Sequence, residues 1–444
     1  EQAREHEAHD CRDTDRLAGT PAHEFAAILD QIIDALLIEL FGVPVERLRG
    51  AAGVIAIFRT KLFVDLMCVL VDELAQRPQA FPGLHLAFGG KLTALDLGFF
   101  AVSACFTDPV VALALGLFAF QFAHNTPFAN LCQAENLTPE TVGDWRDIPT
   151  VQTRAFKSLD LTVLPEADRE TLFRSSGTTQ VDRSRHFHCA ETLAVYHASL
   201  WPWFAGHLVD ESANRLLFLF PELGQAPESS LVHMMDTVAK RLAKREHCFA
   251  TDAQWRIDGQ AAVDFLHDCA TQNEPVTILG TAFSFVHLLD HLDADAIDFQ
   301  LPSGSAAMET GGYKGRSREM PRPKLHQAIT AKLGVASGRI ICEYGMCELS
   351  SQAYDGKLGQ ANAAPRLFRF PPWARARVVS PETLADVELG QAGLLQVVDL
   401  ANAGSALSLQ TEDLARRHAD GFELLGRAEL PESRGCSLMN LTHA

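Results

Sequence analysis

Several familiar functional motifs are missing from this sequence of 444 residues. Its ten cysteines are scattered, and none of them forms the CxxC pair of a zinc ribbon or a thioredoxin-type site. The Walker pattern GxxxxGK[ST] is also absent, which argues against a P-loop nucleotide site. Lysine does not occur after Lys357, so the C-terminal part of the sequence offers no lysine side chain for chemistry.

Positive charge is in short supply. Lysine and arginine number 38 against 56 acidic residues, and the formal net charge is −18. Without a broad basic surface, binding to nucleic acid is not expected, and an anionic ligand would need a local cluster of donors. The stretch EQAREHEAHDCRDTDR has no apolar core like that of a secretory signal, and scattered free thiols suit a reducing compartment. We therefore expect a cytoplasmic protein.

No uninterrupted apolar run is long enough to cross a membrane. The longest candidate, LGFFAVSACFTDPVVALALGLFAFQFA, covers residues 97–123 and is split by Asp108 and Pro109. The two parts hold about ten and a dozen residues, whereas a spanning helix needs about 20. Two buried helices are the first interpretation and a membrane hairpin is the alternative. Stable membrane insertion is not expected.

The chain is long enough for two or three domains, and its 47% apolar and 21% charged residues are typical of a folded protein. Apolar residues at helical spacing predict a helical N-terminal extension of unknown function over residues 1–104. Farther along, helical stretches alternate with short apolar runs that we interpret as strands: RLLFLF, VTILG, RIICEYG and LLQVVDL. This alternation predicts an α/β domain of layered sheets and helices over residues 105–425, followed by a short C-terminal arm over 426–444.

The stretch RSSGTTQVDRSRHFH, which begins at Arg174, concentrates serine, glycine and threonine. The backbone N–H groups of such a loop, helped by its hydroxyls, can surround phosphate oxygens. Taken by itself, however, the stretch is better interpreted as a polar turn, because short motifs of this kind often occur without function.

More polar clusters follow downstream. METGGYKGRSRE, residues 308–319, combines three glycines with one lysine and two arginines. In EYGMCELSSQAYD, Tyr344 offers an aromatic face for a base, and Glu348 offers an oxygen ligand for Mg²⁺. In LQTEDLARR, Asp413 could accept hydrogen bonds from a ribose diol. Taken singly, each has an ordinary alternative: a core aromatic, a solvated turn or a helix N-terminal acid.

The order of these clusters resembles the adenylate-forming superfamily, which contains acyl- and aryl-CoA ligases and adenylation domains. Within it, the sequence is most similar to the acyl-protein synthetases of the LuxE type, known from bacterial bioluminescence operons. The resemblance covers residues 105–444 and rests on these stretches: SSGTT, SRHFH, APESSLVHMM, LGTAFSFVHLLD, METGGYKGRSRE, EYGMCELSSQAYD and RGCSL. Residues 1–104 lie outside it.

The resemblance implies that a fatty acid is activated with ATP and Mg²⁺ as an acyl-adenylate, and that a protein cysteine then takes the acyl group. It implies a phosphate-holding loop made of Ser175, Ser176, Gly177, Thr178 and Thr179. The other implied roles are adenine stacking for Tyr344, magnesium binding for Glu348, ribose binding for Asp413, ribose or phosphate binding for Arg427, and acyl acceptance for Cys436.

The sequence also departs from the superfamily. Larger members carry a mobile C-terminal lid with a catalytic lysine, and we expect that lid to be truncated here. We expect Lys314, Arg316 or Arg318, in a glycine-flanked segment, to replace the lysine. Gln180 stands where the superfamily usually has glycine, which would reduce the mobility of the phosphate loop. Cys347 stands where a threonine hydroxyl is usual, which bears on the rate of adenylation.

The implied partners are acyl-protein reductase and acyltransferase subunits of a multienzyme complex. Two alternatives stay open. One is a CoA ligase of the phenylacetate type, which the short C-terminus and RGCSL disfavour. The other is a non-catalytic nucleotide-binding scaffold, motivated by Gln180 and Cys347. His186 and His287 could be bases, but we interpret both as polar histidines with satisfied hydrogen bonds.

Overall fold

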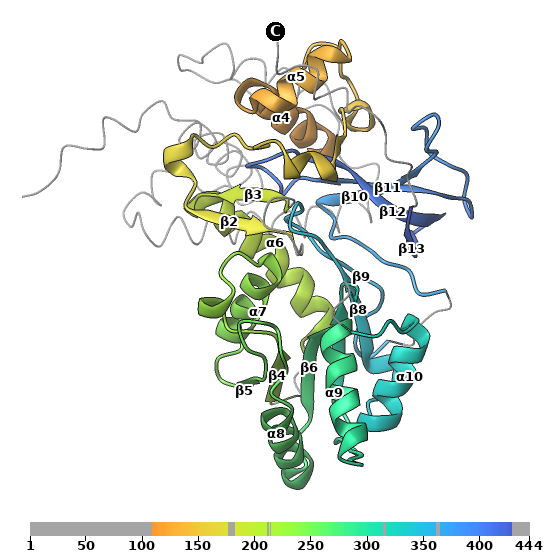
Figure 1. Cartoon of the computed structure of the whole chain (residues 1–444). Coiled ribbons are helices and arrows are strands. Elements are labelled where there is room, and N and C mark those ends of the chain that lie inside the picture. Colours follow the sequence, from red (N-terminus) through yellow and green to blue (C-terminus); the bar gives the residue numbers. More distant parts are fainter. Residues whose placement is uncertain are drawn as a thin grey trace, which may run out of the picture.

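The computed structural model describes residues 109–175, 183–210, 213, 215–313, 317–360 and 365–428. These residues form two sheets, a separate two-stranded hairpin and the helices that cover them (Figure 1). The expected helical extension over residues 1–104 and the C-terminal part of the expected arm lie outside this range. The predicted α/β class, with layered sheets and helices, is confirmed in the part of the chain that is described.

A six-stranded sheet forms one half of the molecule. Its strands run in the order β5-β4-β6-β7-β8-β9, parallel except for the antiparallel β9 at one edge. The inner strands are buried along their whole length, as expected for parallel strands that are covered on both faces. The strands are β4 (Arg215–Leu219), β5 (Glu246–Phe249), β6 (Val276–Thr281), β7 (Ala306–Thr310), β8 (Ile340–Tyr344) and β9 (Ala353–Tyr354).

Helices cover both faces of this sheet, and alternation along β4 explains why. Leu217 and Leu219 belong to the cluster packed by α8 (Gly259–Gln272), α9 (Ala282–Ala294) and α10 (Arg322–Leu333). Leu216 and Phe218 point the other way, into the cluster packed by α6 (Ala190–Leu208) and α7 (Ser230–Arg241). Since successive side chains of a strand point to opposite faces, one apolar run supplies both cores.

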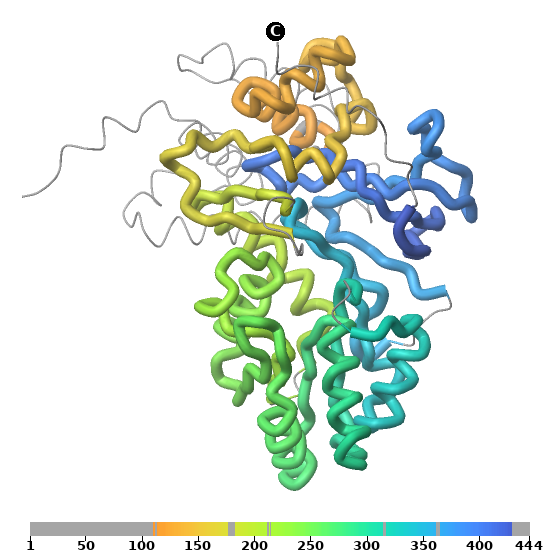
Figure 2. Tube along the Cα trace, viewed as in Figure 1, coloured from red at the N-terminus to blue at the C-terminus, as the bar shows by residue number. Residues whose placement is uncertain are grey.

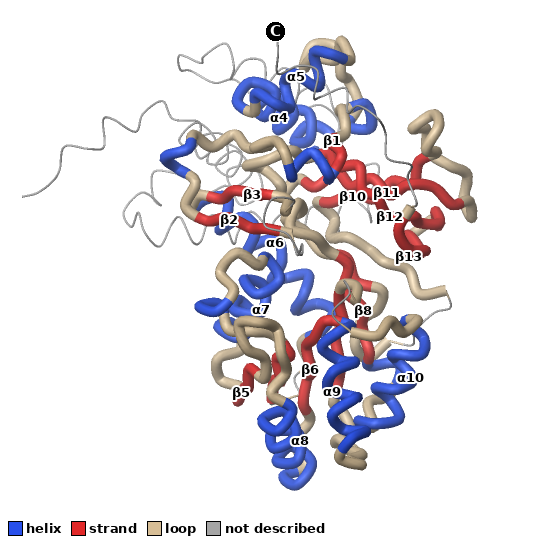
Figure 3. Tube along the Cα trace, in the orientation of Figure 1, coloured by secondary structure: helices blue, strands red, loops and turns tan. Residues whose placement is uncertain are grey.

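A second, largely antiparallel sheet lies beside the first (Figure 3). It is ordered β1-β12-β11-β10, and β13 also pairs with β12. Its strands are β1 (Val151–Gln152), β10 (Ala374–Val379), β11 (Ala392–Asp399), β12 (Ser408–His418) and β13 (Gly421–Arg427). The hairpin of β2 (Thr171–Arg174) and β3 (Arg185–His188) is a separate sheet. The sequence suggested a boundary between the α/β domain and the C-terminal arm at residues 425 and 426. Strand β13 includes both of these residues.

Two helices that come early in the described chain pack against this late sheet: α4 (Pro109–His124) and α5 (Thr126–Ala134) (Figure 2). The Gln121 side chain joins them to it, since its Nε2 donates to the carbonyl oxygen of Asn402 at 2.9 Å and its Oε1 accepts from the backbone N–H of Leu407 at 2.9 Å. Helix α4 covers the second part of the apolar stretch 97–123, and the first part lies outside the described residues. Among the described residues, no helix is both long and apolar enough to cross a membrane.

Candidate active site

A cavity of about 1390 Å³ opens where the two sheets meet. Thr281, Thr310 and Tyr344, which line it, are the last residues of β6, β7 and β8. Because these strands are parallel, their carboxyl ends meet at one edge of the sheet, which is where ligands bind in open α/β folds. The opposite wall comes from β12 and β13 of the second sheet, with residues 411–413, 424, 426 and 427.

The structure brings together the predicted nucleotide-binding and magnesium-binding residues that it describes. They come from four stretches of the sequence and all line this cavity: Ser175, Tyr344, Glu348, Asp413 and Arg427. The others lie outside the described residues: Ser176, Gly177, Thr178, Thr179, Lys314, Arg316 and Cys436. The functional roles assigned to all of these residues remain predictions.

Ser175 follows directly after β2, where the chain enters the serine-glycine-threonine stretch. Its Oγ accepts a hydrogen bond from the backbone N–H of Ser184 at 2.9 Å, and its carbonyl oxygen accepts one from Arg183 Nε at 2.5 Å. Arg174 and Arg183 both contact Glu228, at 3.1 and 3.6 Å. All of these residues line the cavity, so two arginines and the glutamate that pairs with them lie at the start of the predicted phosphate loop.

Tyr344, Asp413 and Arg427 form a connected group across the two sheets. The Tyr344 hydroxyl donates to Asp413 Oδ2 at 2.7 Å, and Arg427 Nε lies 3.5 Å from Asp413 Oδ1. Burial and the neighbouring carboxylate hold the pKa of Tyr344 well above its usual value, so its hydroxyl keeps the proton that it donates. Burial also raises the pKa of Asp413, while the hydrogen bond from Tyr344 opposes that shift.

The Tyr344 ring is held by other aromatic rings. Its centroid lies 6.0 Å from that of Phe368, 6.2 Å from that of Phe370 and 5.7 Å from that of Phe422, in edge-to-face arrangements. The ring is 8% exposed and still contributes to the cavity wall. This packing fixes the orientation of the ring, and the predicted contact with adenine stays a prediction.

Glu348 is a buried carboxylate at the cavity wall, 6% exposed. Its side chain accepts a hydrogen bond from the Cys347 thiol at 3.2 Å, and a thiol is a weak donor. Within the described ranges, no basic side chain forms an ion pair with it, and no group of three or more metal-ligating side chains is present. A carboxylate of this kind fits a cation that takes its other ligands from phosphates and water, as Mg²⁺ does.

The loop that carries Glu348 is held by hydrogen bonds to Asp399 and Asn402. Asn402 Nδ2 donates to the carbonyl oxygen of Glu348 at 2.9 Å, while Asp399 accepts from the Ser350 N–H at 2.9 Å and from Ser351 Oγ at 2.7 Å. Asp399 is fully buried. The carboxylate at the cavity is therefore placed by a polar network that belongs to the second sheet.

His186 has the structural role that we expected. It is 1% exposed, and its Nδ1 lies 2.7 Å from the carbonyl oxygen of Cys347. Burial lowers the pKa of His186 to about 4, so the ring is neutral at physiological pH. The ring supports the backbone next to Glu348. His287 instead lines a smaller neighbouring pocket.

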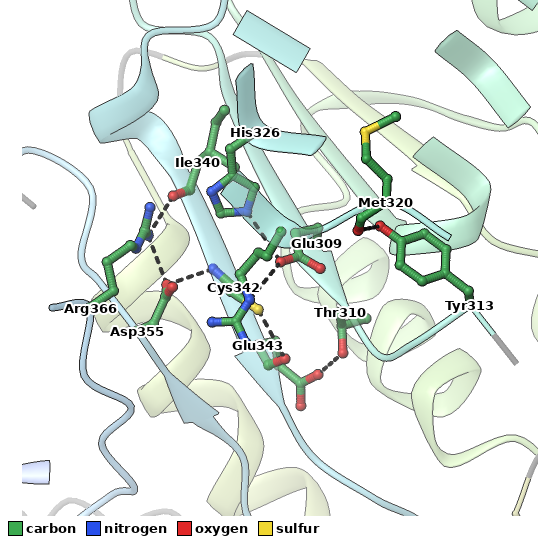
Figure 4. A network of polar contacts seen from close by, with 11 residues as sticks. Glu309, Thr310, Tyr313, Met320, His326, Ile340, Cys342, Glu343, Asp355 and Arg366 are labelled. Atoms are coloured by element: carbon green, nitrogen blue, oxygen red, sulfur yellow. Dashed lines mark hydrogen bonds and ion pairs between the residues drawn. The ribbon is translucent and has the colours of Figure 1, made fainter. Parts of the chain in front are cut away.

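The segment before Lys314 is anchored by a buried network (Figure 4). The Thr310 hydroxyl donates to Glu343, and Glu309 lies 3.2 Å from His326 Nε2. The Tyr313 hydroxyl, directly before Lys314, donates to the carbonyl oxygen of Met320, which follows it, at 2.5 Å. The network ties the ends of β7 and β8 together beneath the cavity.

Arg318 does not take the place that we expected for it. Its guanidinium pairs with Asp290 on the surface at 2.7 Å, and its side chain is 51% exposed. It is not among the residues that line the cavity. The ion pair with a carboxylate of helix α9 holds the side chain away from the cavity, so Arg318 does not suit the role that we expected for it.

Sequence reasoning missed several basic residues of the cavity wall. Arg154 and Lys157 lie on the short 3₁₀ helix η3 (Thr153–Lys157), which no motif marks, and Arg322 begins α10. Arg322 Nε lies 4.0 Å from Glu309 Oε1. Among the described residues, Lys157 forms no ion pair. Since η3 is remote in sequence from every glycine-rich stretch, only the fold brings it to the site.

Known proteins support this picture. The family model for the acyl-protein synthetase LuxE matches residues 227–443. A long-chain-fatty-acid–luciferin-component ligase of Aliivibrio fischeri is 22% identical over 339 residues, which cover 72% of this chain and 85% of that protein. The corresponding ligase of Vibrio harveyi is 21% identical over 346 residues, with 73% and 85% covered.

Solved structures support the fold. A 2-hydroxyisobutyryl-CoA ligase in an open conformation, in complex with 2-HIB-AMP and CoA, superposes with a TM-score of 0.52 at 13% identity. The match covers 71% of this chain and 69% of that one. The same ligase in the thioesterification state gives a TM-score of 0.53. The expected enzyme class, a ligase, is confirmed by the sequence relatives. The resemblance drawn from the motifs is confirmed as well: this chain is similar in sequence to the LuxE-type acyl-protein synthetases and has the fold of the adenylate-forming ligases.

Proposed function

We propose that this protein activates a long-chain fatty acid with ATP as an acyl-adenylate and transfers the acyl group to a protein cysteine. One observation carries the proposal: five residues chosen from four separate stretches of the sequence line one cavity at the carboxyl edge of a parallel sheet, namely Ser175, Tyr344, Glu348, Asp413 and Arg427. The fatty acid is taken from the names of the relatives. The transfer onward to an acyl-protein reductase, in a complex with acyltransferase subunits, is what the resemblance of the motifs implies.

The cavity suits a nucleoside triphosphate together with a fatty acid. Its volume of about 1390 Å³ exceeds the roughly 300–1,000 Å³ typical of a site for one small ligand. The cavity wall carries charges of both signs. Its basic side chains are Arg154, Lys157, Arg174, Arg183, Arg322 and Arg427, and its carboxylates are Glu228, Glu309, Glu319, Glu343, Glu348, Glu412 and Asp413. The basic side chains are the donors available to an anionic ligand, and most of them also pair with carboxylates of the wall.

In the proposed first step, a carboxylate oxygen of the fatty acid attacks the α-phosphorus of ATP. A new phosphorus–oxygen bond forms, the bond to the bridging oxygen breaks, and pyrophosphate leaves with that electron pair. The basic side chains of the wall stabilise the charge of the transferring phosphate, and positioning supplies much of the rate. Glu348 would hold Mg²⁺, which when bound neutralises phosphate charge.

In the proposed second step, a cysteine thiolate attacks the acyl carbon. A thioester bond forms, and the bond between the acyl carbon and the phosphate oxygen breaks to release AMP. Cys436 is the proposed acceptor in this chain, on the strength of the RGCSL stretch. The thiolate is the reactive form of cysteine, and the nearby Arg434 in the sequence favours it.

The first step is tested by fatty-acid-dependent exchange of pyrophosphate into ATP. Glu348→Gln should lower the exchange rate by about 10²-fold, the usual scale for loss of one electrostatic contributor to a transition state. Glu388→Gln, at an exposed position away from the cavity, serves as the matched control. Exchange that is unchanged in Glu348→Gln contradicts the role of Glu348. Absence of exchange with acids of every chain length would favour the non-catalytic scaffold.

The second step is tested by intact mass after incubation with ATP, Mg²⁺ and a fatty acid. A hydroxylamine-labile acyl adduct that is lost in Cys436→Ser supports the acyl-protein synthetase. The solved CoA ligases of the same fold motivate the second candidate, an acyl-CoA ligase. Release of free acyl-CoA without any protein adduct would favour that candidate.

A further inference from the structure

One part of the cavity wall is apolar and lies between helices. Leu231 and Met234 contribute from α7, Phe283 from the start of α9, and Trp255 from the turn between β5 and α8. Leu231, Met234 and Trp255 share one hydrophobic cluster. The Trp255 ring lies 5.8 Å from that of Phe283 and 6.0 Å from that of Phe220, centroid to centroid. This wall suits an alkyl chain, whereas the basic residues described above suit phosphates.

Trp255 has an unusual backbone conformation for so large a residue. Its φ is +62°, in the left-handed region that bulky side chains rarely adopt. Such a conformation costs about 1–3 kcal/mol and persists only when the surroundings impose it. Strained residues of this kind gather at functional sites.

The surroundings of Trp255 do impose the conformation. Its backbone N–H donates to the carbonyl oxygen of Asp252 at 2.8 Å, and the Asp252 N–H donates to the carbonyl oxygen of Arg256 at 3.0 Å. The Asp252 carboxylate accepts from the N–H groups of Gln254 and Arg256, both at 2.9 Å, and pairs with the Arg256 guanidinium. The tight turn therefore fixes the backbone at Trp255, and the ring contacts with Phe220 and Phe283 orient the indole.

Behind Trp255 lies a second pocket of about 540 Å³. It shares Gln254 and Trp255 with the main cavity, so the turn that carries these two residues is the wall between the two spaces. The lining is more polar than the apolar wall on the other side: Arg256, Ile257, Gly259, His287 and His291 complete it. Gln254 is exposed and Trp255 is half-buried. Of these two side chains, the indole of Trp255 therefore contributes more to the wall between the two pockets.

We propose that Trp255 is a specificity-determining residue that ends the acyl-binding part of the cavity and so limits the length of the acid that is activated. The inference rests on the proposed function, because it assigns the apolar wall to the alkyl chain. The indole blocks the path to the second pocket, and the strained turn keeps it from moving aside. Chains longer than the site would have to displace an aromatic ring that packs on Phe220 and Phe283.

Trp255→Gly is the sharpest test, because glycine removes the indole and adopts a positive φ without strain. The substitution joins the two pockets and leaves the turn relaxed. One additional methylene of the substrate that is bound in an apolar site changes kcat/KM by roughly tenfold or more. We compare two acids: the one that the wild type activates best, and one that is two carbons longer. In Trp255→Gly, kcat/KM for the longer acid, divided by kcat/KM for the shorter one, should be at least about tenfold higher than in the wild type.

The measurement is acid-dependent pyrophosphate exchange over a series of saturated fatty acids of increasing length. Leu384→Gly is the matched control, since Leu384 also has a positive φ, of +56°, but is 52% exposed and lines neither pocket. It should leave the length profile unchanged. Trp255→Asn, which also tolerates the left-handed region, keeps the test valid if Trp255→Gly fails to fold.

The possible results separate this inference from the proposed function. A shift of the optimum toward longer acids in Trp255→Gly or Trp255→Asn, and not in Leu384→Gly, supports the assignment of Trp255. An active wild-type protein whose length profile is the same in the Trp255 variants overturns that assignment and leaves the proposed function standing. A wild-type protein without exchange for any acid overturns the proposed function itself.

Discussion

At the scale of single residues, the candidate site is built from buried polar side chains whose partners come from distant parts of the sequence. Tyr344 and Asp413 illustrate this, since the hydroxyl of one donates to the carboxylate of the other at 2.7 Å. From the motifs, each of them is predicted to contact a nucleotide. The structure adds that the two side chains are hydrogen-bonded to one another. Asp413 thus has a fixed orientation before any ligand binds.

Asp399 provides a test of the network that holds the Glu348 loop. Burial raises the pKa of Asp399 to about 6, from an ordinary value of 3.8. The folded state therefore holds this proton more tightly than the unfolded state. The resulting contribution to stability is fully present below the ordinary value and is lost as pH rises through about 6. Asp399→Asn carries no such proton, so it should lack this pH dependence.

The measurement is the free energy of unfolding in urea for the wild type and Asp399→Asn, from about pH 4 to pH 7. The wild type should lose on the order of 2 kcal/mol relative to the variant over this range. Comparison with the variant cancels the groups that titrate in both proteins. A difference that stays constant with pH would mean that burial does not govern the protonation of Asp399.

At the scale of elements, strand β4 shows what short apolar runs can and cannot predict. The run RLLFLF correctly predicts a buried strand, as do VTILG, RIICEYG and LLQVVDL for β6, β8 and β11. The strand order β5-β4-β6-β7-β8 could not be predicted, because each run is apolar on both faces and pairs equally well with any other. Contacts at the strand ends, rather than the runs themselves, distinguish the neighbours.

Arg215, the first residue of β4, makes such contacts. Its side chain is 5% exposed and pairs with Glu246 of β5 at 3.0 Å, as well as with Asp268 of α8 and Glu274. Arg215→Met should lower the free energy of unfolding by about 1–3 kcal/mol, since hydrogen bonds to charged groups contribute on that scale and solvent screens the partly exposed carboxylates.

Chemical denaturation measures the effect of Arg215→Met, with Arg146→Met as the control. Arg146 pairs with Asp144 at 2.8 Å, but both side chains are about half exposed, at 52% and 43%. Its substitution should cost no more than about 1 kcal/mol. Equal losses in the two variants would show that the buried position of Arg215 adds nothing to the pairing of β4 with its neighbours.

At the scale of the whole molecule, the cavity belongs to neither sheet alone. Tyr344 closes one wall from the parallel sheet, while Asp413 and Arg427 come from β12 and β13 of the other. A nucleotide that contacts both walls would stabilise the folded arrangement of the two sheets. Its contribution follows from mass action and reaches about 2.7 kcal/mol when ATP is at a hundred times its dissociation constant.

We therefore expect ATP to raise the midpoint of thermal unfolding, and Asp413→Asn to reduce this rise by weakening the wall on the second sheet. Differential scanning calorimetry with and without ATP measures both. Glu388→Gln, away from the cavity, should keep the full rise. An equal rise in Asp413→Asn and wild type would place the nucleotide away from the second sheet.

The class of fold, the buried strands, the family resemblance and the short list of residues for a nucleotide site could all be predicted from the sequence. These depend on local patterns: apolar runs, glycine-rich stretches and the order of polar clusters along the chain. Tertiary structure alone decided which of them meet. It added Arg154 and Lys157 to the cavity, turned Arg318 toward Asp290, and set Trp255 between two pockets. The physical reason is that side-chain direction and the pairing of distant strands depend on contacts made across the whole chain, which no local pattern contains.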